Sequence, residues 1–392
     1  MTAPRSTGTR LLEEGPPDHG PLQVSIRSAA IDGCAATAEQ REGDRALQIV
    51  PSEQDRRQGI TVNSSAQRSR LPLDQERASL DLGLERNPVD QVVAVVSTHR
   101  PSDQLVENVN ALLTQTNQVV IIDDGSGPSA DRLLEQVAGD RVTVVRLPAN
   151  RGIAAALNAG IEIARQVNAR YLLTMDQDSR LSPEYVATAV SATTQLELAG
   201  KGVLAVGAGT VNGICIDPRD PRSFVPILDT LQSGLLFRME AMDAIGPFDE
   251  RLFIDCVDTE YILRGATLGF ETFRAKACSL DHALGRSLSG RLPGGRSVEF
   301  AYHTAWRRYY ITRNRIEVVR RYGLRFPKWT ALQGYDQARY FGLTLLFGPQ
   351  PGRQLMAFGA AVAHGLGRRL GPIPARLHAR LSGPATVQEH VA

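Results

Sequence analysis

Hydrophobic positions divide the chain into two parts that meet near residue 91. Residues 1–90 are rich in Arg, Glu, Asp, Gln, Ser and Pro, and their apolar residues follow no sustained period. Such a composition leaves too little apolar surface to offset the entropy lost on ordering. The first continuous apolar run, QVVAVVS, occupies residues 91–97. We therefore predict a disordered extension over residues 1–90 and a folded domain that begins at residue 91.

From residue 91 onward, short apolar runs alternate with longer amphipathic segments. Segments 105–113 and 153–164 carry apolar residues three and four positions apart, which is the spacing of one helix face. The apolar runs lie at 91–97, 118–123, 141–147 and 170–175. Strands that alternate with helices are typical of βαβ units, so the pattern predicts an α/β fold with a mainly parallel central sheet.

Acidic residues follow two of these predicted strands. Asp123 and Asp124 end the second run, and Asp176 and Asp178 end the fourth. Ligands in sheets of this kind bind at the carboxyl ends of the strands. Two carboxylates one residue apart point the same way from an extended chain, and clustered oxygen ligands suit Mg²⁺ or Mn²⁺. Asp176 and Asp178 thus predict a divalent-metal site, although a turn or a helix cap also accounts for acids at a strand end.

Several protein classes are disfavoured by motifs that the sequence lacks. The first run leads into THRP at 98–101 and not into the G-x-G-x-x-G turn of dinucleotide-binding domains, and no G-x-x-x-x-G-K-[ST] loop occurs. The four cysteines have no C-x-x-C spacing, so neither a zinc site nor a disulfide framework is expected. Residues 1–20 lack the apolar segment of a signal peptide, and no apolar run reaches the length of about 18 residues that a membrane span needs. The sequence therefore predicts a cytoplasmic protein, or one that lies peripherally on the inner face of the plasma membrane.

Basic residues are concentrated near the C-terminus. Residues 301–380 contain fourteen Lys or Arg but only two acids, Glu317 and Asp336, whereas the net charge of the whole chain is +2. Aromatic and apolar residues interleave with these cations, which predicts a basic helical region over residues 299–392. The cations either form a solvated helical surface or attract an anionic membrane surface or a diphosphate-bearing substrate. Segment 355–366 is too short to span a bilayer but can lie flat at its interface. No nucleic-acid partner is expected, because no binding motif accompanies the charge.

Six short motifs occur in a fixed order between residues 95 and 285: VVSTHRP, VVIIDDGS, NRGIAAALNAG, TMDQDS, FIDCVDTEYILR and HALG. Together with YYITRN at 309–314, they make the chain resemble glycosyltransferase family 2. Within that family it is most similar to the bacterial rhamnosyltransferases, and next to the galactofuranosyltransferases. The resemblance covers about residues 91–320. It implies a GT-A type fold with a catalytic domain over residues 91–298.

The resemblance also implies a reaction, its partners and residue roles. A sugar, with rhamnose as the best match, moves with inversion from a nucleotide-diphosphate donor, dTDP-rhamnose or a UDP-sugar. The acceptor is a saccharide or a polyprenyl-linked saccharide of cell-envelope polysaccharide synthesis. A divalent metal, Mg²⁺ or Mn²⁺, neutralises the diphosphate leaving group. The implied metal ligands are Asp176, Asp178 and His282, the base is Asp258, the acceptor-side residue is Glu260, and the donor contacts are Thr98, Arg100, Asp123, Asp124, Arg151 and Gly152.

Each of these roles has an ordinary alternative. Asp258 lies where a helix is predicted to begin, with Gly269 as its C-terminal stop, so it can serve simply as a helix cap. Asp255 and Glu260 are the neighbouring candidates for the base, and Glu260 can orient the helix instead. His282 can be a hydrogen-bonded structural histidine. At the level of function, another hexosyltransferase of the family, a nucleotidyltransferase and an inactive sugar-binding scaffold stay open.

Overall fold

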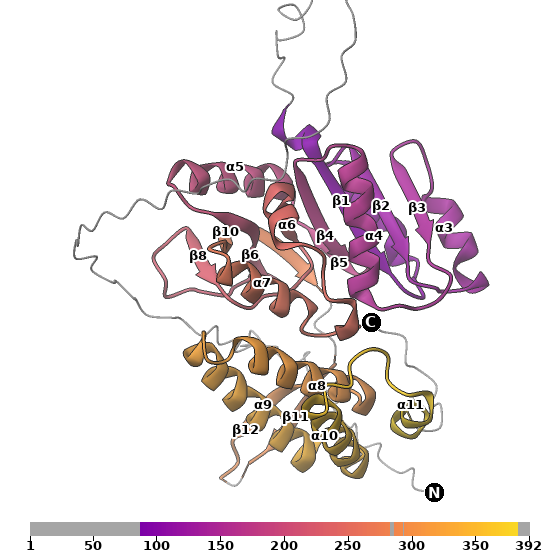
Figure 1. Ribbon diagram of the computed structural model, residues 1–392, viewed down its shortest axis with the longest axis vertical. Helices are drawn as coiled ribbons and strands as arrows, with labels where there is room; N and C mark the ends of the chain where they lie inside the picture. Colours follow the sequence, from indigo (N-terminus) through magenta and orange to yellow (C-terminus); the bar gives the residue numbers. More distant parts are fainter. Residues whose placement is uncertain (1–86, 283–285, 293, 383–392) are drawn as a thin grey trace, which may run out of the picture.

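The computed structural model describes residues 87–282, 286–292 and 294–382 (Figure 1). Almost all of the predicted disordered extension, residues 1–90, therefore lies outside the described residues, and so do residues 283–285 of the HALG motif. Two bodies of different make-up follow one another along the chain. A sheet covered by helices comes first, and a mainly helical region follows it (Figure 1).

The central sheet is built from ten described strands. They are β1 (Val92–Thr98), β2 (Gln118–Asp123), β3 (Val142–Arg146), β4 (Tyr171–Asp176), β5 (Ser179–Leu181), β6 (Val203–Val211), β7 (Ile214–Cys215), β8 (Phe224–Ile227), β9 (Leu235–Arg238) and β10 (Glu271–His282). Eight follow the order β3-β2-β1-β4-β9-β6-β10-β5, while β7 pairs with β6 and β8 pairs with β10. Strands β1 to β4 match the four predicted runs within one residue at each end.

The sheet is parallel in its first half and mixed beyond it. Strands β3, β2, β1 and β4 pair in parallel, as predicted, and β6 also runs parallel to β10. Strand β9 is antiparallel to both β4 and β6, between which it lies. Strand β5 pairs antiparallel with the end of β10. As a result, the carboxyl ends of β1, β2, β4 and β10 reach one edge of the sheet, where ligands of such folds bind.

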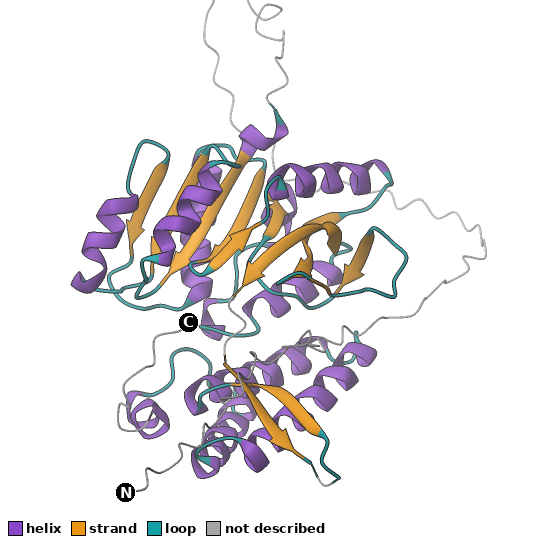
Figure 2. Cartoon of the chain, turned by 180° about the vertical axis from the view of Figure 1, so that it is seen from behind, coloured by secondary structure: helices purple, strands orange, loops and turns teal. Residues whose placement is uncertain are grey.

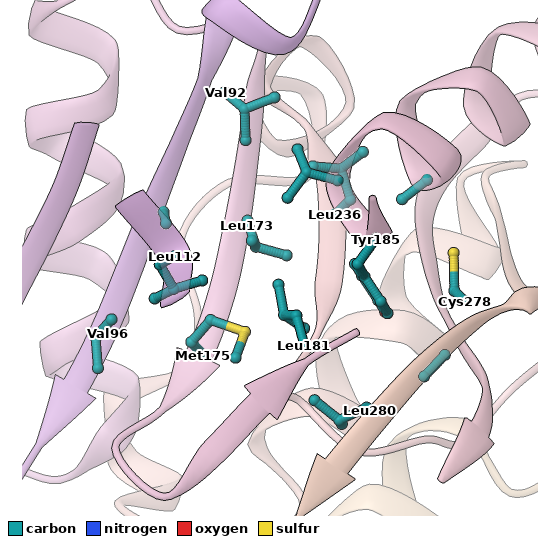
Figure 3. Close-up of a cluster of buried hydrophobic side chains, with 14 of the residues drawn as sticks. Val92, Val96, Leu112, Leu173, Met175, Leu181, Tyr185, Leu236, Cys278 and Leu280 are labelled. Carbon is teal, nitrogen blue, oxygen red and sulfur yellow. The ribbon is translucent and has the colours of Figure 1, made fainter. Parts of the chain in front are cut away.

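Alternate side chains of β1 enter two separate cores. Val92, Ala94 and Val96 pack in the cluster on one face of the sheet, and Val93 and Val95 pack in the cluster on the other. A strand with both faces covered has no polar positions, because successive side chains point to opposite faces. The first of these cores, which includes Leu173, Met175 and Tyr185, is shown in Figure 3.

Helices cover both faces of the sheet. The first core takes side chains from α2 (Gln104–Leu113), α3 (Asp131–Val137) and α5 (Tyr185–Leu198). The second takes side chains from α4 (Ile153–Gln166), α6 (Met239–Ile245) and α7 (Val257–Thr267). Short 3₁₀ turns occur at η1 (Pro88–Gln91), η2 (Pro128–Ala130) and η3 (Glu250–Leu252). Helix α7 begins and ends as predicted, since Gly269, two residues past its last, has a φ of 90°.

The C-terminal region begins with a β-hairpin and continues as helices. The hairpin pairs β11 (Arg286–Arg291) with β12 (Ser297–Tyr302) and lies against the helices (Figure 2). The helices are α8 (Ala305–Tyr322), α9 (Pro327–Phe347), α10 (Pro351–Leu366) and α11 (Ala375–Ser382). The predicted helical character is thus confirmed for the described residues from 305 onward. The hairpin before them is not predicted from the sequence. Across the described ranges, no helix combines the length and the hydropathy that crossing a bilayer requires.

Candidate active site

Three potential metal ligands meet at the carboxyl edge of the sheet. Asp176 is the last residue of β4, Asp178 follows in the turn to β5, and His282 ends β10. One ligand atom from each lies within 4.8 Å of the other two. Because β5 pairs with β10 in a register that aligns Ser179 with His282, the turn after β4 is brought beside a residue more than a hundred positions later. Nδ1 of His282 lies 2.7 Å from Oγ of Ser179 and 4.0 Å from a carboxylate oxygen of Asp178.

The charge balance of this triad favours a cation. Burial raises the pKa of Asp176 to about 6, His282 opposes the rise, and the adjacent Asp178 carboxylate adds to it. Two carboxylates crowded in this way are stabilised by a divalent ion. Oxygen ligands with one imidazole nitrogen match the donor sets of Mn²⁺ and Mg²⁺. The residues present therefore fit the metal that the sequence implies.

Gln177, between the two metal carboxylates, joins this turn to the end of β1. Its side-chain oxygen accepts hydrogen bonds from the hydroxyl of Thr98 (2.5 Å) and from the backbone N–H of His99 (3.0 Å). Its backbone carbonyl accepts from the amide of Asn108 (2.8 Å). Thr98 is buried, whereas Arg100 lies on the exposed loop that follows, with a φ of 52°. Gln177 thus holds the metal turn against the end of β1, where the strand and the loop after it carry two of the predicted donor contacts.

Asp124 organises the loop before α4. Its two carboxylate oxygens accept from the backbone N–H groups of Arg151 (2.6 Å) and Gly152 (2.7 Å). Gly152 has a φ of 89°, and a Cβ there would lie 2.3 Å from the carbonyl oxygen of Phe253. The loop therefore requires glycine at this position. The guanidinium of Arg151 pairs with Glu250 at 2.7 Å on the surface.

Asp123 is fully buried, and its carboxylate is used within the protein. One oxygen accepts from the backbone N–H of Ser126 (3.2 Å) and from the Ser126 hydroxyl, and the other lies 3.3 Å from Nε of Arg146. These contacts fasten the loop after β2 to strand β3. Its predicted contact with the nucleotide-sugar donor stays a prediction.

Asp258, the predicted base, is the second residue of α7 and is only partly buried. A carboxylate oxygen accepts from the backbone N–H of Thr259 (2.8 Å), so Asp258 interacts with the helix N-terminus without being its N-cap, which is Cys256. The pKa of Asp258 is raised to about 7, most by burial and next by the Asp229 carboxylate, whose effect exceeds the opposing effect of Arg315. A carboxylate with a pKa near the working pH is suited to act as a general base.

The sequence does not predict Asp229, which lies in the β8–β9 loop beside Asp258. One of its carboxylate oxygens accepts from the hydroxyl of Thr259 (2.7 Å). The other lies 3.4 Å from Arg315 of α8 and accepts from the amide of Gln333 of α9 (3.0 Å). The signal in the sequence that could have indicated Asp229 is its position shortly after the short strand β8. Asp229 therefore connects the candidate base to two helices of the C-terminal region.

The loop before α7 has an unusual backbone, held in place by α8. Phe253, Asp255 and Cys256 all have φ between 60° and 68°, which is strained for residues other than glycine. The buried amide of Asn314 donates to the carbonyls of Leu252 (2.9 Å), Ile254 (2.7 Å) and Asp255 (2.8 Å). These hydrogen bonds explain how the strained loop persists directly before Asp258. The YYITRN motif thus has a structural role at the site.

Arg307 links the metal triad to the loop that carries Asp255. Its Nε lies 3.4 Å from a carboxylate oxygen of Asp255. The pKa of Arg307 is raised, most by Asp255 and also by Asp176 and Asp178. Arg307 therefore interacts both with Asp255, in the loop before α7, and with Asp176 and Asp178 of the metal triad. Its charge links these two groups of acids.

Glu260 is buried among cations and a tyrosine. Its carboxylate lies 3.1 Å from Arg264 and 3.3 Å from Arg321, and it accepts from the hydroxyl of Tyr322 (2.7 Å). These contacts join α7 to α8, so they favour the helix-orienting role that the sequence left open. Contact with the acceptor stays a prediction.

Comparison with known proteins shows which family the first part of the chain matches. Residues 93–207 match the model of glycosyl transferase family 2. The dTDP-rhamnosyl transferase RfbF of Shigella flexneri is 27% identical over 246 residues, which cover 59% of this chain and 80% of that protein. The galactofuranosyltransferase GlfT1 of Mycobacterium tuberculosis is 25% identical over 258 residues, covering 60% and 84%. A crystal structure of S. aureus TarS is 16% identical, with a TM-score of 0.46 over 71% of this chain and 81% of that one.

The chain therefore contains a glycosyl transferase family 2 domain, as its ordered motifs predict. The GT-A type fold is confirmed with it: a central sheet carries helices on both faces, and a helical region follows. The family match ends at residue 207. It thus includes Asp176 and Asp178 but not Asp258 or His282.

Proposed function

We propose that this protein is an inverting, metal-dependent glycosyltransferase that moves rhamnose from dTDP-rhamnose to a saccharide or polyprenyl-linked saccharide in cell-envelope polysaccharide synthesis. The observation that carries the proposal is the pairing of two acidic clusters at the carboxyl edge of the sheet. One cluster is the triad that includes Asp178. The other surrounds Asp258, a carboxylate with a pKa of about 7. The choice of rhamnose is supported by the similarity to a dTDP-rhamnosyl transferase.

The residues of the chain divide the chemistry between them. Asp258 takes the proton of the acceptor hydroxyl, whose oxygen then bonds to the anomeric carbon of the donor sugar. The bond between that carbon and the diphosphate oxygen breaks on the opposite side, so the configuration inverts. A divalent ion bound by Asp176, Asp178 and His282 would stabilise the charge left on the diphosphate. Asp229 keeps the pKa of Asp258 high enough for proton transfer near neutral pH.

Donor binding falls to residues at the ends of β1 and β2 and before α4. Arg100 is exposed at this edge, and no ion pair to its guanidinium is found among the described residues, so it is available for a phosphate. Thr98, Asp123, Asp124, Arg151 and Gly152 shape the loops around the nucleotide. The carboxylates of Asp123 and Asp124 already accept hydrogen bonds within the protein. We therefore propose that these two residues mainly hold the loops in shape.

A galactofuranosyltransferase is the second candidate. It is favoured by the similarity to GlfT1, which spans a slightly larger part of this chain than the similarity to RfbF, at slightly lower identity. The two candidates share the same site chemistry and differ only in the donor sugar and nucleotide.

A donor screen tests the proposal. The full-length protein is incubated with dTDP-rhamnose, UDP-galactofuranose or UDP-glucose and a panel of saccharide and polyprenyl-linked acceptors, each with and without Mn²⁺, and products are detected by mass spectrometry. Transfer of rhamnose that requires the metal is the expected result. Release of a sugar 1-phosphate with a nucleotidylated product would indicate a nucleotidyltransferase instead, and failure of every donor to react, despite binding, would point to a scaffold.

A further inference from the structure

Helix α9 exposes an apolar stripe bordered by cations. Lys328, Leu332, Tyr335, Arg339 and Leu346 recur at the spacing of a single helix face. Leu332 is 37% exposed, Tyr335 66% and Leu346 73%. These residues run from the first turn of the helix to its last, so one face of α9 is exposed and carries three apolar side chains and two cations.

Helix α10, the next element, also exposes apolar residues. Leu355, Met356 and Leu366 are 53%, 45% and 72% exposed, and the small residues Gly359 and Ala363 lie between them on the same face. Only residues 348–350 separate α9 from α10, and a ring stack at 4.5 Å between Phe341 and Phe358 packs the two helices together. We call the outward residues Leu332, Tyr335, Leu346, Leu355, Met356 and Leu366 the α9–α10 face.

Among the described residues, the cations that follow α8 lack carboxylate partners, whereas four of the six arginines of α8 have one. Residues 324–382 contain a single acid, Asp336. Within the described ranges, no carboxylate pairs with any of Lys328, Arg339, Arg353, Arg368, Arg369, Arg376 and Arg380. On α8, by comparison, Arg315, Arg320 and Arg321 all have carboxylate partners. The unpaired charges are therefore a property of this outer region and not of the basic segment as a whole.

We propose that the α9–α10 face docks on the surface of an anionic bilayer, with both helices lying in its plane. Exposed apolar residues gathered on one surface mark an interaction site. Apolar side chains bordered by unpaired cations match the interface between acyl chains and anionic headgroups. A second copy of this chain fits less well, because it would bring two sets of unpaired cations together. The inference goes beyond the proposed reaction and does not depend on it.

Vesicle flotation of the full-length protein tests this surface. Vesicles of phosphatidylcholine with phosphatidylglycerol should carry the protein, whereas vesicles of phosphatidylcholine alone should not. The binding should fall in about 1 M salt, where charges are screened beyond about 3 Å. Equal binding to both vesicle types, or none to either, would overturn the proposal.

Paired variants separate the α9–α10 face from the rest of the surface. Lys328→Gln with Arg339→Gln should weaken binding about thirtyfold, at about fivefold per cation. Leu346→Gln with Leu366→Gln should weaken it to a similar degree. The matched controls are Arg141→Gln with Arg219→Gln, and Leu198→Gln with Leu268→Gln, which change exposed residues of the sheet body and should leave binding unchanged.

Three results of this comparison would count against the bilayer. The first is binding that neither α9–α10 variant reduces. The second is an equal loss in the controls. The third is a wild-type protein that does not bind vesicles and forms a dimer, measured by size-exclusion chromatography with light scattering, when the Leu346→Gln, Leu366→Gln variant is monomeric.

Discussion

The side-chain amide of Asn314 lies 2.8 Å from the carbonyl oxygen of Asp255, and it also donates to two carbonyls earlier in the same loop. Asn314 is fully buried in α8, whereas Asp255 has a φ of 62° in the loop that leads into the candidate base. A helix of the C-terminal region thus fixes backbone geometry directly before the candidate base.

Replacing Asn314 by Ala should release this loop. The carbonyls of Ile254 and Asp255 would lose the Asn314 donor, and the Leu252 carbonyl would keep only its bonds from Arg313 and Ile254. We expect a loss of about 2 kcal/mol in the free energy of unfolding, measured by urea denaturation. Activity should fall further than stability explains, because the loop precedes Asp258. Asn117→Ala is the control, since Asn117 is exposed and makes one surface hydrogen bond to Asp90. An Asn314→Ala protein as stable as this control would contradict the role assigned to the clamp.

Asp178→Ala should remove metal-dependent turnover. A divalent ion contributes several kcal/mol of charge stabilisation to such a reaction, so its loss should slow transfer at least about a hundredfold. The partly exposed position of Asp178 predicts an unchanged melting temperature. Asp140→Ala, on an exposed turn, serves as the control. Full activity of the wild-type protein in excess EDTA would exclude the metal role.

Asp258→Asn should abolish transfer without weakening donor binding. Asn keeps the size of the side chain but cannot take a proton, and removal of a general base costs about 10²- to 10⁴-fold. Donor affinity is measured by calorimetry alongside acceptor turnover. Glu260→Gln is the contrasting variant, because its contacts between α7 and α8 predict an effect on stability. If Asp258→Asn keeps more than about a tenth of the turnover, the base is elsewhere, and Asp255 is tested next.

Asp229→Asn should move the pH profile of turnover toward acid. The Asp258 pKa of about 7 is raised most by burial and next by the Asp229 carboxylate. Neutralising Asp229 lowers this pKa, so the ascending limb of kcat/KM against pH shifts to lower pH. Asp243→Asn on α6, which removes a surface ion pair to Arg165, should leave the limb where it is. A limb that stays or moves to higher pH would show that Asp229 does not act on the base.

The raised pKa of Asp258 also predicts that Asp258→Asn stabilises the folded protein, although the same change abolishes activity. Between the ordinary value of 3.8 and the folded value of about 7, the folded protein binds more protons at Asp258 than the unfolded chain does. The free energy of unfolding therefore falls as pH rises through this window. Asp258→Asn should melt at a higher temperature than wild type at pH 8, and the gain should shrink toward pH 4. If Asp258→Asn and wild type had the same melting temperature as each other at pH 8 and at pH 4, folding would not destabilise the Asp258 carboxylate.

The sequence predicts those parts of the molecule that depend on local pattern. Strands β1 to β4 follow from continuous apolar runs, and the acids after β4 follow from their position at a strand end. Strand β9 has only four residues, LLFR, and its antiparallel insertion between β4 and β6 depends on pairing with distant strands. The role of Asn314 is hidden for a similar reason, because its partners lie about sixty residues earlier. Asp229 becomes significant only when α7, α8 and α9 pack around it.

The position of β9 also constrains how the chain can fold during its synthesis. Strand β6 pairs with β7, β9 and β10, all of which follow it in the sequence, and β4 presents an open edge until β9 arrives. At about 5 to 20 residues per second, segment 212–234 takes roughly one to five seconds to make. During that interval an apolar strand and an open sheet edge are exposed together, which is a condition for misassembly. We therefore expect nascent chains that end before residue 235 to bind chaperones more readily than chains that extend past residue 282, where β9 and β10 are both complete.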